Sequence, residues 1–172
     1  MDREKLFREA IEENRQRIFR ICSYYFPNHD DRNDAFQEAL IRIWDNISSF
    51  KGNSQVSTWI YRVVVNSCLG YMRREKRRKE IIDSDKPVET VTLAVHETQE
   101  DQKQTEEKIY FFKDFISGLS VSDRTLVSLY LEELSTREMA EITGLSEANV
   151  RVRIFRIKEQ VKKEWEEKKH GT

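Results

Sequence analysis

The sequence predicts an all-α protein made of two small helical domains, an N-terminal helical bundle and a C-terminal helix-turn-helix domain, joined by a flexible acidic linker. With only 5 Gly and 2 Pro in 172 residues, the chain has too few turn residues for an all-β sandwich. Apolar residues recur at helical spacing in residues 1–80 and again in residues 108–172. Between them, residues 81–107 show no periodicity and carry 8 acidic side chains against 2 basic ones, which is typical of an extended linker.

The N-terminal domain is predicted to hold three helices. The first has one apolar face, made of Phe7, Ile11, Ile18, Cys22 and Tyr25, and it ends at the turn residues 27–30. The second has Ala35, Phe36, Ala39, Leu40, Ile43, Trp44 and Ile47 on its apolar side. After a polar loop, Ser57 or Thr58 is expected to cap a third helix that runs to about Arg78. That helix is apolar almost all round between Trp59 and Met72, so we expect it to be mostly buried.

Helical periodicity returns at about Glu107 in the C-terminal domain, where Ser122 is a candidate N-cap. The run Ser135-Thr-Arg-Glu138 is a capping box that opens a short helix. Gly144 then supplies a turn, and Ser146 is expected to cap a last helix that extends to about Lys168. A helix, a glycine turn and a second helix within about thirty residues is the helix-turn-helix pattern.

The last helix has a basic outer face. Its buried stripe is predicted to be Val150, Ile154, Ile157, Val161 and Trp165, while residues 151–163 carry six Lys or Arg and one acid. Val152 and Phe155 are apolar but lie off that stripe. In a DNA major groove they could contact thymine methyl groups while the arginines reach guanine edges or phosphates. The alternative is a solvated basic helix whose Phe155 packs on a neighbour, but cap, turn, stripe and basic face together favour DNA binding.

The third helix carries a second candidate nucleic-acid surface. Trp59, Arg62, Asn66, Gly70 and Arg73 follow one another at steps of three or four residues and share one face. An aromatic ring can stack on a base, an amide can hydrogen-bond a base edge, and Phe50 in the preceding loop could add a second aromatic wall. Residues 73–79 add six positive charges in seven positions, enough to hold phosphates. Spacing alone leaves a core Trp and a solvated charge run equally open.

Acidic and polar residues lie on the exposed side of the second helix. They are Asp34, Gln37, Glu38, Ile41 and Asp45. This surface could bind a basic partner, and composition alone favours simple solvation.

Several classes of protein and site are not expected. No stretch reaches the roughly 20 apolar residues of a membrane span, and the N-terminus lacks the apolar region of a signal peptide, so we expect a soluble, cytoplasmic protein without membrane insertion. Cys22 and Cys68 have no CxxC partner and are expected to be buried thiols. His29, His96 and His170 have no ligand-spaced companion, and no Gly-rich phosphate loop occurs. We therefore expect no metal, no cofactor and no enzymatic activity.

Taken in order, these motifs resemble the extracytoplasmic-function (ECF) class of bacterial RNA polymerase sigma factors. The run from Asp34 to Trp44 is similar to the helix of that family that binds core polymerase. Phe50 to Ser54, followed by Ser57 to Asn66, is similar to its −10 loop and recognition helix. The segment from Leu131 to Lys158 is similar to its −35-reading helix-turn-helix. The resemblance covers nearly all of the chain outside the linker.

The resemblance assigns a role to each surface. Residues 1–80 would be sigma region two and residues 108–172 sigma region four. Core RNA polymerase would be bound by Asp34, Gln37 and Glu38, against the clamp helices of its largest subunit. Promoter DNA at −10 would be held as a single strand by Phe50 and Asn66 around a flipped base, with Trp59, Arg62 and Arg73 in support. The −35 duplex would be read or clasped by Arg151, Val152, Phe155 and Arg156, with Arg153 and Lys158 on phosphates.

The resemblance also implies an anti-sigma partner, often membrane-anchored in this class. The expected function is that of a dissociable sigma factor that directs promoter recognition, DNA melting and initiation. The alternative is a stand-alone helix-turn-helix regulator, which would need a ligand pocket or a dimer face in residues 1–80 and would bind duplex DNA by itself.

Overall fold

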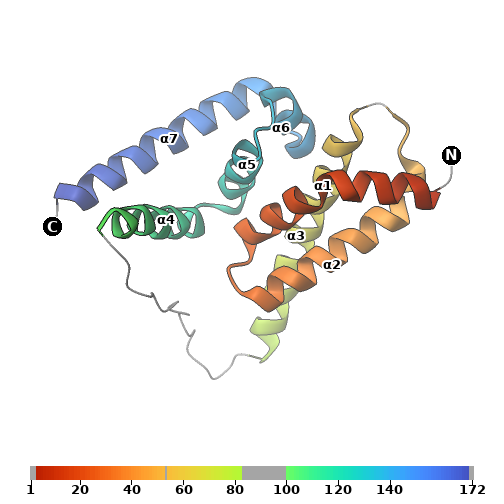
Figure 1. Cartoon of the computed structure of the whole chain (residues 1–172), viewed down its shortest axis with the longest axis horizontal. Helices are drawn as coiled ribbons and strands as arrows, with labels where there is room; N and C mark the ends of the chain where they lie inside the picture. Colours follow the sequence, from red (N-terminus) through yellow and green to blue (C-terminus); the bar gives the residue numbers. More distant parts are fainter. Residues whose placement is uncertain (1–2, 53, 83–99, 171–172) are drawn as a thin grey trace.

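The computed structural model describes residues 3–52, 54–82 and 100–170, and every regular element in these ranges is helical (Figure 1). The elements are α1 (Arg3–Tyr25), α2 (His29–Asn46), the 3-10 turn η1 (Ile47–Ser49), α3 (Val56–Ile82), α4 (Glu100–Gly118), α5 (Val121–Leu131), α6 (Thr136–Thr143) and α7 (Glu147–His170). The all-α expectation is confirmed. Residues 83–99 of the predicted linker lie outside the described residues.

Helices α1, α2 and α3 pack on one another around an apolar core, in which α3 contributes Ile60, Val64 and Val65. A buried polar contact links α3 to α1, since the Tyr61 hydroxyl donates to Asn14 Oδ1 at 2.5 Å. Cys22 and Cys68 also meet there, both fully buried, with their sulfur atoms 3.8 Å apart. The expectation of two buried free thiols is confirmed.

Helix α3 begins earlier than the sequence predicted. It starts at Val56, and the Trp59 amide already donates to the Gln55 carbonyl. Neither Ser57 nor Thr58 is therefore its cap, and this prediction was wrong. Thr58 is instead buried, and its hydroxyl donates to the Glu138 carboxylate of α6 at 3.3 Å.

Two predictions about the second half of the chain were also wrong. Residues 100–107, expected in the linker, form the first turns of α4. Gln, Lys and Glu dominate this stretch, and their intrinsic helix propensity is high even without apolar periodicity. The cap of α5 is Ser120, whose hydroxyl accepts from the Asp123 amide. The predicted cap, Ser122, accepts a hydrogen bond from Arg153 instead.

The helix-turn-helix is confirmed. The Ser135 and Glu138 side chains form both hydrogen bonds of the capping box at the start of α6. Gly144 ends α6 in the left-handed region, at φ 75°, and the Ser146 hydroxyl accepts from the Asn149 amide in the first turn of α7. Helix α7 then runs back over α5 and α4 (Figure 1).

The two halves of the chain share a core. Helix α5 lies against α1, and α6 lies against α3 (Figure 1). Leu126, Leu129 and Met139 of the second half belong to the same buried cluster as Ile18 and Tyr61 of the first half. A separate, smaller cluster around Phe115, Ile116, Val127 and Ile157 holds α4, α5 and α7 together. In the part of the chain that the structure describes, no helix is long and apolar enough to cross a membrane.

Replacing Gly144 by alanine should destabilise the fold by about 1 kcal/mol, because an L-residue with a Cβ is disfavoured in the left-handed region. No atom lies within 4 Å of the added Cβ, so the loss would be conformational and not steric. Urea unfolding of the full chain measures it. Gly118→Ala is the matched control, since Gly118 has the same open space without a left-handed backbone. Equal stability of the two variants would contradict this account.

Candidate functional site

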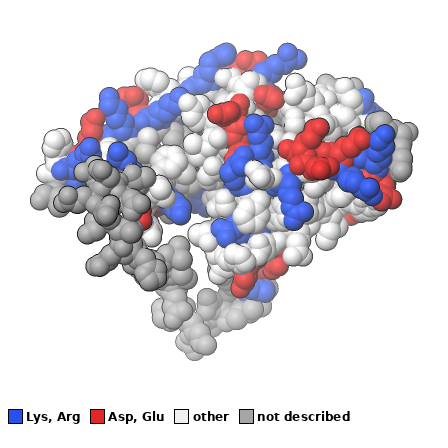
Figure 2. Space-filling view, in the orientation of Figure 1, with Lys and Arg blue, Asp and Glu red and all other residues white. Residues whose placement is uncertain are grey.

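The exposed face of α7 matches the predicted nucleic-acid surface. Val150, Ile154 and Ile157 point into the core, and Arg151, Val152, Phe155 and Arg156 between them are exposed. Phe155 is 64% exposed and Val152 46% exposed, which excludes packing of Phe155 on a neighbouring helix. Lys and Arg side chains surround these two apolar residues and form a blue band along the upper left edge of the molecule (Figure 2).

The basic residues of α7 differ in what they already contact. Arg156 is exposed, and Arg151 has only its own-helix neighbour Glu147, at 3.4 Å. The Lys158 ammonium lies 4.2 Å from the centre of the Tyr130 ring, a cation–π contact that leaves the side chain at the surface. Arg151, Arg156 and Lys158 are all exposed, so each can contact a ligand without a change in the packing of α7.

Arg153 is held by the protein itself. Its guanidinium contacts Asp123 Oδ1 at 2.6 and 2.9 Å and Ser122 Oγ at 2.8 Å. Both charged side chains of this pair are only about a quarter exposed, at 27% and 28%. Arg153 therefore fixes α7 against the start of α5.

The predicted aromatic pair on the first half of the chain is present. The Phe50 and Trp59 rings lie 5.8 Å apart at 52°, and both are half-buried. One and two turns further along α3, Arg62 is half-buried and Asn66 is exposed. Arg73 is exposed near the end of the same face, where its Nε donates to the Leu69 carbonyl.

Arg62 makes a contact that the sequence did not indicate. Its Nη2 donates to the Glu141 backbone carbonyl at 2.5 Å and lies 3.5 Å from the Glu141 carboxylate. Glu141 belongs to α6, so the helix-turn-helix covers one part of the α3 face. Gly70 turns toward α2, since a Cβ there would meet Arg74 Nη1 at 3.5 Å and Arg42 Nη2 at 3.7 Å.

The outer face of α2 is polar at one end and apolar at the other. Asp34 and Gln37 are exposed. The Glu38 carboxylate forms two ion pairs, with Arg42 of the same helix at 2.7 Å and with Arg74 of α3. Its charge is therefore largely neutralised within the protein, and Asp34 remains as the exposed acid beside it.

Ile41 and Trp44 continue this face with exposed apolar surface. Ile41 is 60% exposed, and the Trp44 ring is covered on one side by the Arg3 guanidinium, 4.4 Å from its centre. The sequence placed Trp44 on the buried side of α2, and the structure leaves it partly at the surface. An apolar residue surrounded by polar ones is typical of a protein-binding surface.

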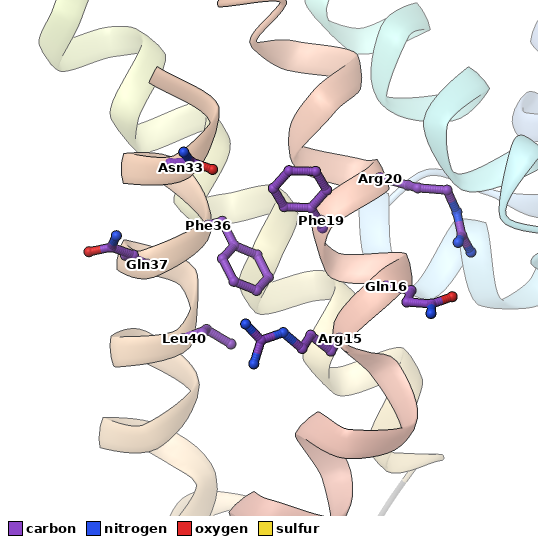
Figure 3. A pocket seen from close by; sticks show the side chains of 8 residues that line it. All are labelled: Arg15, Gln16, Phe19, Arg20, Asn33, Phe36, Gln37 and Leu40. Atoms are coloured by element: carbon purple, nitrogen blue, oxygen red, sulfur yellow. The ribbon is translucent and has the colours of Figure 1, made fainter. Parts of the chain in front are cut away.

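A groove between α1 and α2 was not foreseen. It has a volume of about 750 Å³, and its lining includes the Phe19 and Phe36 rings, which meet edge to face with their centroids 5.5 Å apart (Figure 3). The Arg15 guanidinium lies 5.7 Å from the Phe36 ring and that of Arg32 lies 5.2 Å from the Phe19 ring. Gln37 lines the same groove, so it connects the groove with the polar end of the α2 face.

No group of three or more His, Cys, Asp or Glu in the described residues is arranged to hold a metal ion. The ionisable side chains with clear pKa shifts are structural. Burial raises the pKa of Tyr71 to about 12, and the hydrogen bond from Ser135 lowers the pKa of the Glu138 capping carboxyl.

Two family models match the chain. Sigma-70 region 2 matches residues 10–78, and Sigma-70 region 4 matches residues 112–161. The ECF RNA polymerase sigma-E factor of Haemophilus influenzae is 32% identical over 146 residues, which cover 79% of this chain and 75% of that protein. The ECF RNA polymerase sigma factor SigW of Bacillus subtilis is 29% identical over 164 residues, covering 92% and 88%.

Solved structures agree in fold. The sigma factor RpoE of Bartonella quintana, solved with the anti-sigma factor NepR, superposes with a TM-score of 0.73 at 20% identity and covers 92% of this chain and 96% of that one. CnrH, solved with the cytosolic domain of CnrY, superposes at 0.64 and 15% identity, covering 95% and 89%.

The chain therefore belongs to the ECF class of RNA polymerase sigma factors. It acts with core RNA polymerase on promoter DNA in promoter recognition and transcription initiation, and the function expected from the sequence is confirmed. The members of this family are regulatory subunits, and the stand-alone regulator is not supported.

Arg153→Ala should lower the free energy of unfolding by about 1 kcal/mol, because it removes a two-bond ion pair that is only partly screened by water. Urea unfolding of Arg153→Ala, Asp123→Ala and the double variant measures the coupling, which we expect to be about 0.5–1 kcal/mol. Arg156→Ala is the matched control on the same helix and should leave stability unchanged. Strictly additive losses at positions 123 and 153 would rule out this positioning role.

Proposed function

We propose that three surfaces of this sigma factor divide the work of initiation. Residues 1–80 act as sigma region two and bind core polymerase and the −10 strand, while residues 108–172 act as sigma region four and bind the −35 duplex. The observation that carries this proposal is the exposed Phe155 and Val152 pair within the basic face of α7. Exposed apolar side chains among arginines on the second helix of a helix-turn-helix are suited to a major groove.

At −35, phosphate contacts set the position and base contacts set the sequence. We assign base contacts to Arg151, Val152, Phe155 and Arg156. Lys158 is free to reach a phosphate at the edge of the helix. Arg153 can add a phosphate contact only with the part of its guanidinium that Asp123 leaves open, so its main contribution is the orientation of α7.

At −10, Phe50 and Asn66 are proposed to hold a base flipped out of the non-template strand. Flipping costs a few kcal/mol, and stacking on an aromatic ring recovers about 1–3 kcal/mol for each base. The Phe50–Trp59 pair supports this role because the two rings are in contact, with their centres 5.8 Å apart, and Trp59 thereby limits the movement of Phe50. The exposed amide of Asn66 and the guanidinium groups of Arg62 and Arg73 lie further along the same helix face.

Core polymerase is proposed to bind the outer face of α2 through Asp34 and Gln37, with Glu38 in support. Exposed Ile41 next to them supplies apolar area of the kind that dominates interface energies. The internal ion pairs of Glu38 with Arg42 and Arg74 suit it to hold α2 on α3 at this interface. An anti-sigma partner is proposed as well, because the similar protein RpoE of Bartonella quintana is described as a sigma factor in complex with the anti-sigma factor NepR.

We propose that the chain has no catalytic activity of its own and acts in the cytoplasm with the polymerase. Run-off transcription with purified bacterial core polymerase, with and without the full chain, on a random-promoter library tests the function directly. Promoter-specific transcripts should form only when the chain is present, and their sequences would give both promoter elements. DNA binding by the chain alone, with no transcripts and no co-elution with core polymerase, would overturn the proposal.

Asn66→Ala should impair promoter opening more than polymerase binding, because the lost amide faces DNA and not the α2 surface. Permanganate footprinting of the holoenzyme measures opening, and co-elution with core polymerase measures binding. Glu12→Ala, an exposed change on α1, is the control that should alter neither. If opening and binding fall equally, Asn66 is not a base contact.

Arg151→Ala should weaken discrimination among −35 sequences by about 1–3 kcal/mol if its contact with a base is bidentate. Holoenzyme binding to a panel of −35 variants measures it. Lys162→Ala, an exposed basic change further along α7, should weaken all variants to a similar degree. Unchanged ratios among −35 variants in Arg151→Ala would reduce this residue to a phosphate contact.

A further inference from the structure

Three acidic side chains follow one another along one stripe of α2. Asp31, Asp34 and Glu38 are separated by three and four positions, a spacing that places them on the same side of a helix. Asp34 is exposed, whereas Asp31 and Glu38 are half-buried. The outer two acids of the stripe are therefore partly covered by a neighbour. The middle acid, which belongs to the proposed polymerase-binding face, is left in solvent.

Glu38 is covered by α3. Its carboxylate accepts a hydrogen bond from the Arg74 guanidinium of α3 and pairs with Arg42, one turn further along α2, at 2.7 Å. The Glu38 side chain is only 25% exposed, and that of Arg74 is 50% exposed. An isolated ion pair at a surface contributes little to stability, but one carboxylate held by two arginines forms a network, and networks contribute more. Glu38 and Arg74 therefore fix α2 against α3.

Asp31 is covered by the same helix. The Tyr71 hydroxyl of α3 donates to Asp31 Oδ1 at 3.3 Å, and the Tyr71 ring meets the Phe26 ring edge to face, with the centres 5.1 Å apart. Burial and the nearby Asp31 charge raise the pKa of Tyr71 to about 12, so this hydroxyl remains a donor at neutral pH. Tyr71 and Arg74 are three residues apart on α3, and each contacts one of the outer acids. Together they fix the part of α2 that lies between these two acids.

Gly70 leaves room for both arginines. A Cβ at this position would lie 3.5 Å from Arg74 Nη1 and 3.7 Å from Arg42 Nη2. A methyl group at these distances is in ordinary van der Waals contact, whereas a longer side chain would occupy the volume of the two guanidinium groups. Glycine is unfavourable inside a helix, and its presence in the middle of α3 fits the close approach of Arg74 and Arg42 to the backbone there.

Arg74 also belongs to the basic run of residues 73–79, which the sequence suggested for binding phosphates. Its neighbours in the run make contacts within α3. Arg73 donates to the Leu69 carbonyl, and Arg78 pairs with Glu75 at 3.2 Å. Arg74 instead reaches across to α2. If its guanidinium moved to a phosphate, it would leave a partly buried carboxylate without this partner, which is unfavourable.

We propose that Arg74 is a positioning residue for polymerase binding and is not one of the phosphate contacts of the basic run. Together with Tyr71, it holds the acidic stripe of α2 against α3, so that Asp34 is presented to the polymerase in a fixed orientation. A surface that is already held in its bound orientation loses less conformational entropy on binding. This inference rests on the proposed function for the identity of the partner that binds α2.

Arg74→Gln in the full chain tests the positioning role. Its binding to purified core polymerase should weaken about fivefold, because α2 loses a contact that holds it in the bound orientation. Glu38→Gln should also weaken binding, and the double variant should bind no more weakly than the weaker single variant, since the two groups act through each other. Arg74→Lys keeps the charge and should restore part of the affinity.

Arg78→Gln is the matched control for core binding. It removes an equal charge from the same basic run, but its ion pair with Glu75 stays within α3. The affinity of this variant for core polymerase should equal that of the parent, because no contact between α3 and α2 is lost.

The salt dependence of DNA binding separates positioning from phosphate contact. Holoenzyme is formed with a saturating amount of the chain and bound to a promoter duplex selected from the run-off library, over a range of salt concentrations. Arg73→Gln should reduce the slope of log affinity against log salt by about 1, the change expected for one lost phosphate contact. Arg74→Gln should leave this slope unchanged.

Gly70→Leu reaches the same cluster without removing a charge. Its side chain would displace both guanidinium groups from Glu38, so core affinity should fall as it does in Arg74→Gln. Gly70→Ala is the matched variant, and it should lose less affinity because its methyl group fits beside the arginines. Circular dichroism checks that every variant keeps its helical content.

Urea unfolding of the free chain gives a readout that needs no polymerase. The midpoint shifts of Arg74→Gln and Glu38→Gln should not add in the double variant. Additive shifts, or an unchanged core affinity of Arg74→Gln, would overturn the positioning role. A salt slope reduced as in Arg73→Gln would show that Arg74 contacts a phosphate and would overturn the proposal as well. Failure of the parent to bind core polymerase or to support run-off transcription would instead refute the proposed function and leave the unfolding result standing.

Discussion

The burial of α3 is the constraint on which the rest of this structure depends. It is the helix that contacts α1, α2 and α6 (Figure 1), and its apolar residues Ile60, Val64 and Cys68 are fully buried. The hydrophobic effect of burying such a helix sets the positions of the two helices on either side of it. Among the described side chains of α3, Asn66 and the basic residues from Arg73 onward remain at the surface. Within the proposed −10 surface, Asn66 and Arg73 are therefore exposed, whereas Trp59 packs against the core and Arg62 contacts α6.

The charged side chains fall into two groups according to whether they are already paired within the protein. Arg153, Arg20 and Glu38 are engaged in ion pairs that fix one helix against another. Arg156 and Arg151 stay exposed with at most a contact on their own helix. If a basic side chain that is paired with a partly buried carboxylate moved to a ligand, the carboxylate would be left unpaired. Such a residue therefore keeps its ion pair and fixes the orientation of its helix. A basic residue in solvent keeps its full charge available for phosphate.

Local patterns in the sequence predicted local features of the fold well. The capping box at Ser135 and the left-handed Gly144 depend on hydrogen bonds and backbone preferences within a few residues, and both are present. The predicted outward positions of Val152 and Phe155 also hold, since helical periodicity determines which residues share a face. Errors arose where two nearby residues of the same type could cap one helix, as with Ser120 and Ser122, or where propensity without periodicity extended a helix, as at the start of α4.

The sequence by itself determined that the chain is helical, which faces of its helices are apolar, where the helix-turn-helix lies and which family motifs it carries, because these properties depend on residues close together in the chain. Only the tertiary structure decided that Glu132 meets Arg20, that Glu141 meets Arg62, and that Phe19 and Phe36 line one groove. These contacts join residues up to 112 positions apart. Glu132 and Arg20 are each compatible with a solvated surface when judged from their neighbours in sequence, and it is the packing of α5 on α1 that buries the Glu132 carboxylate.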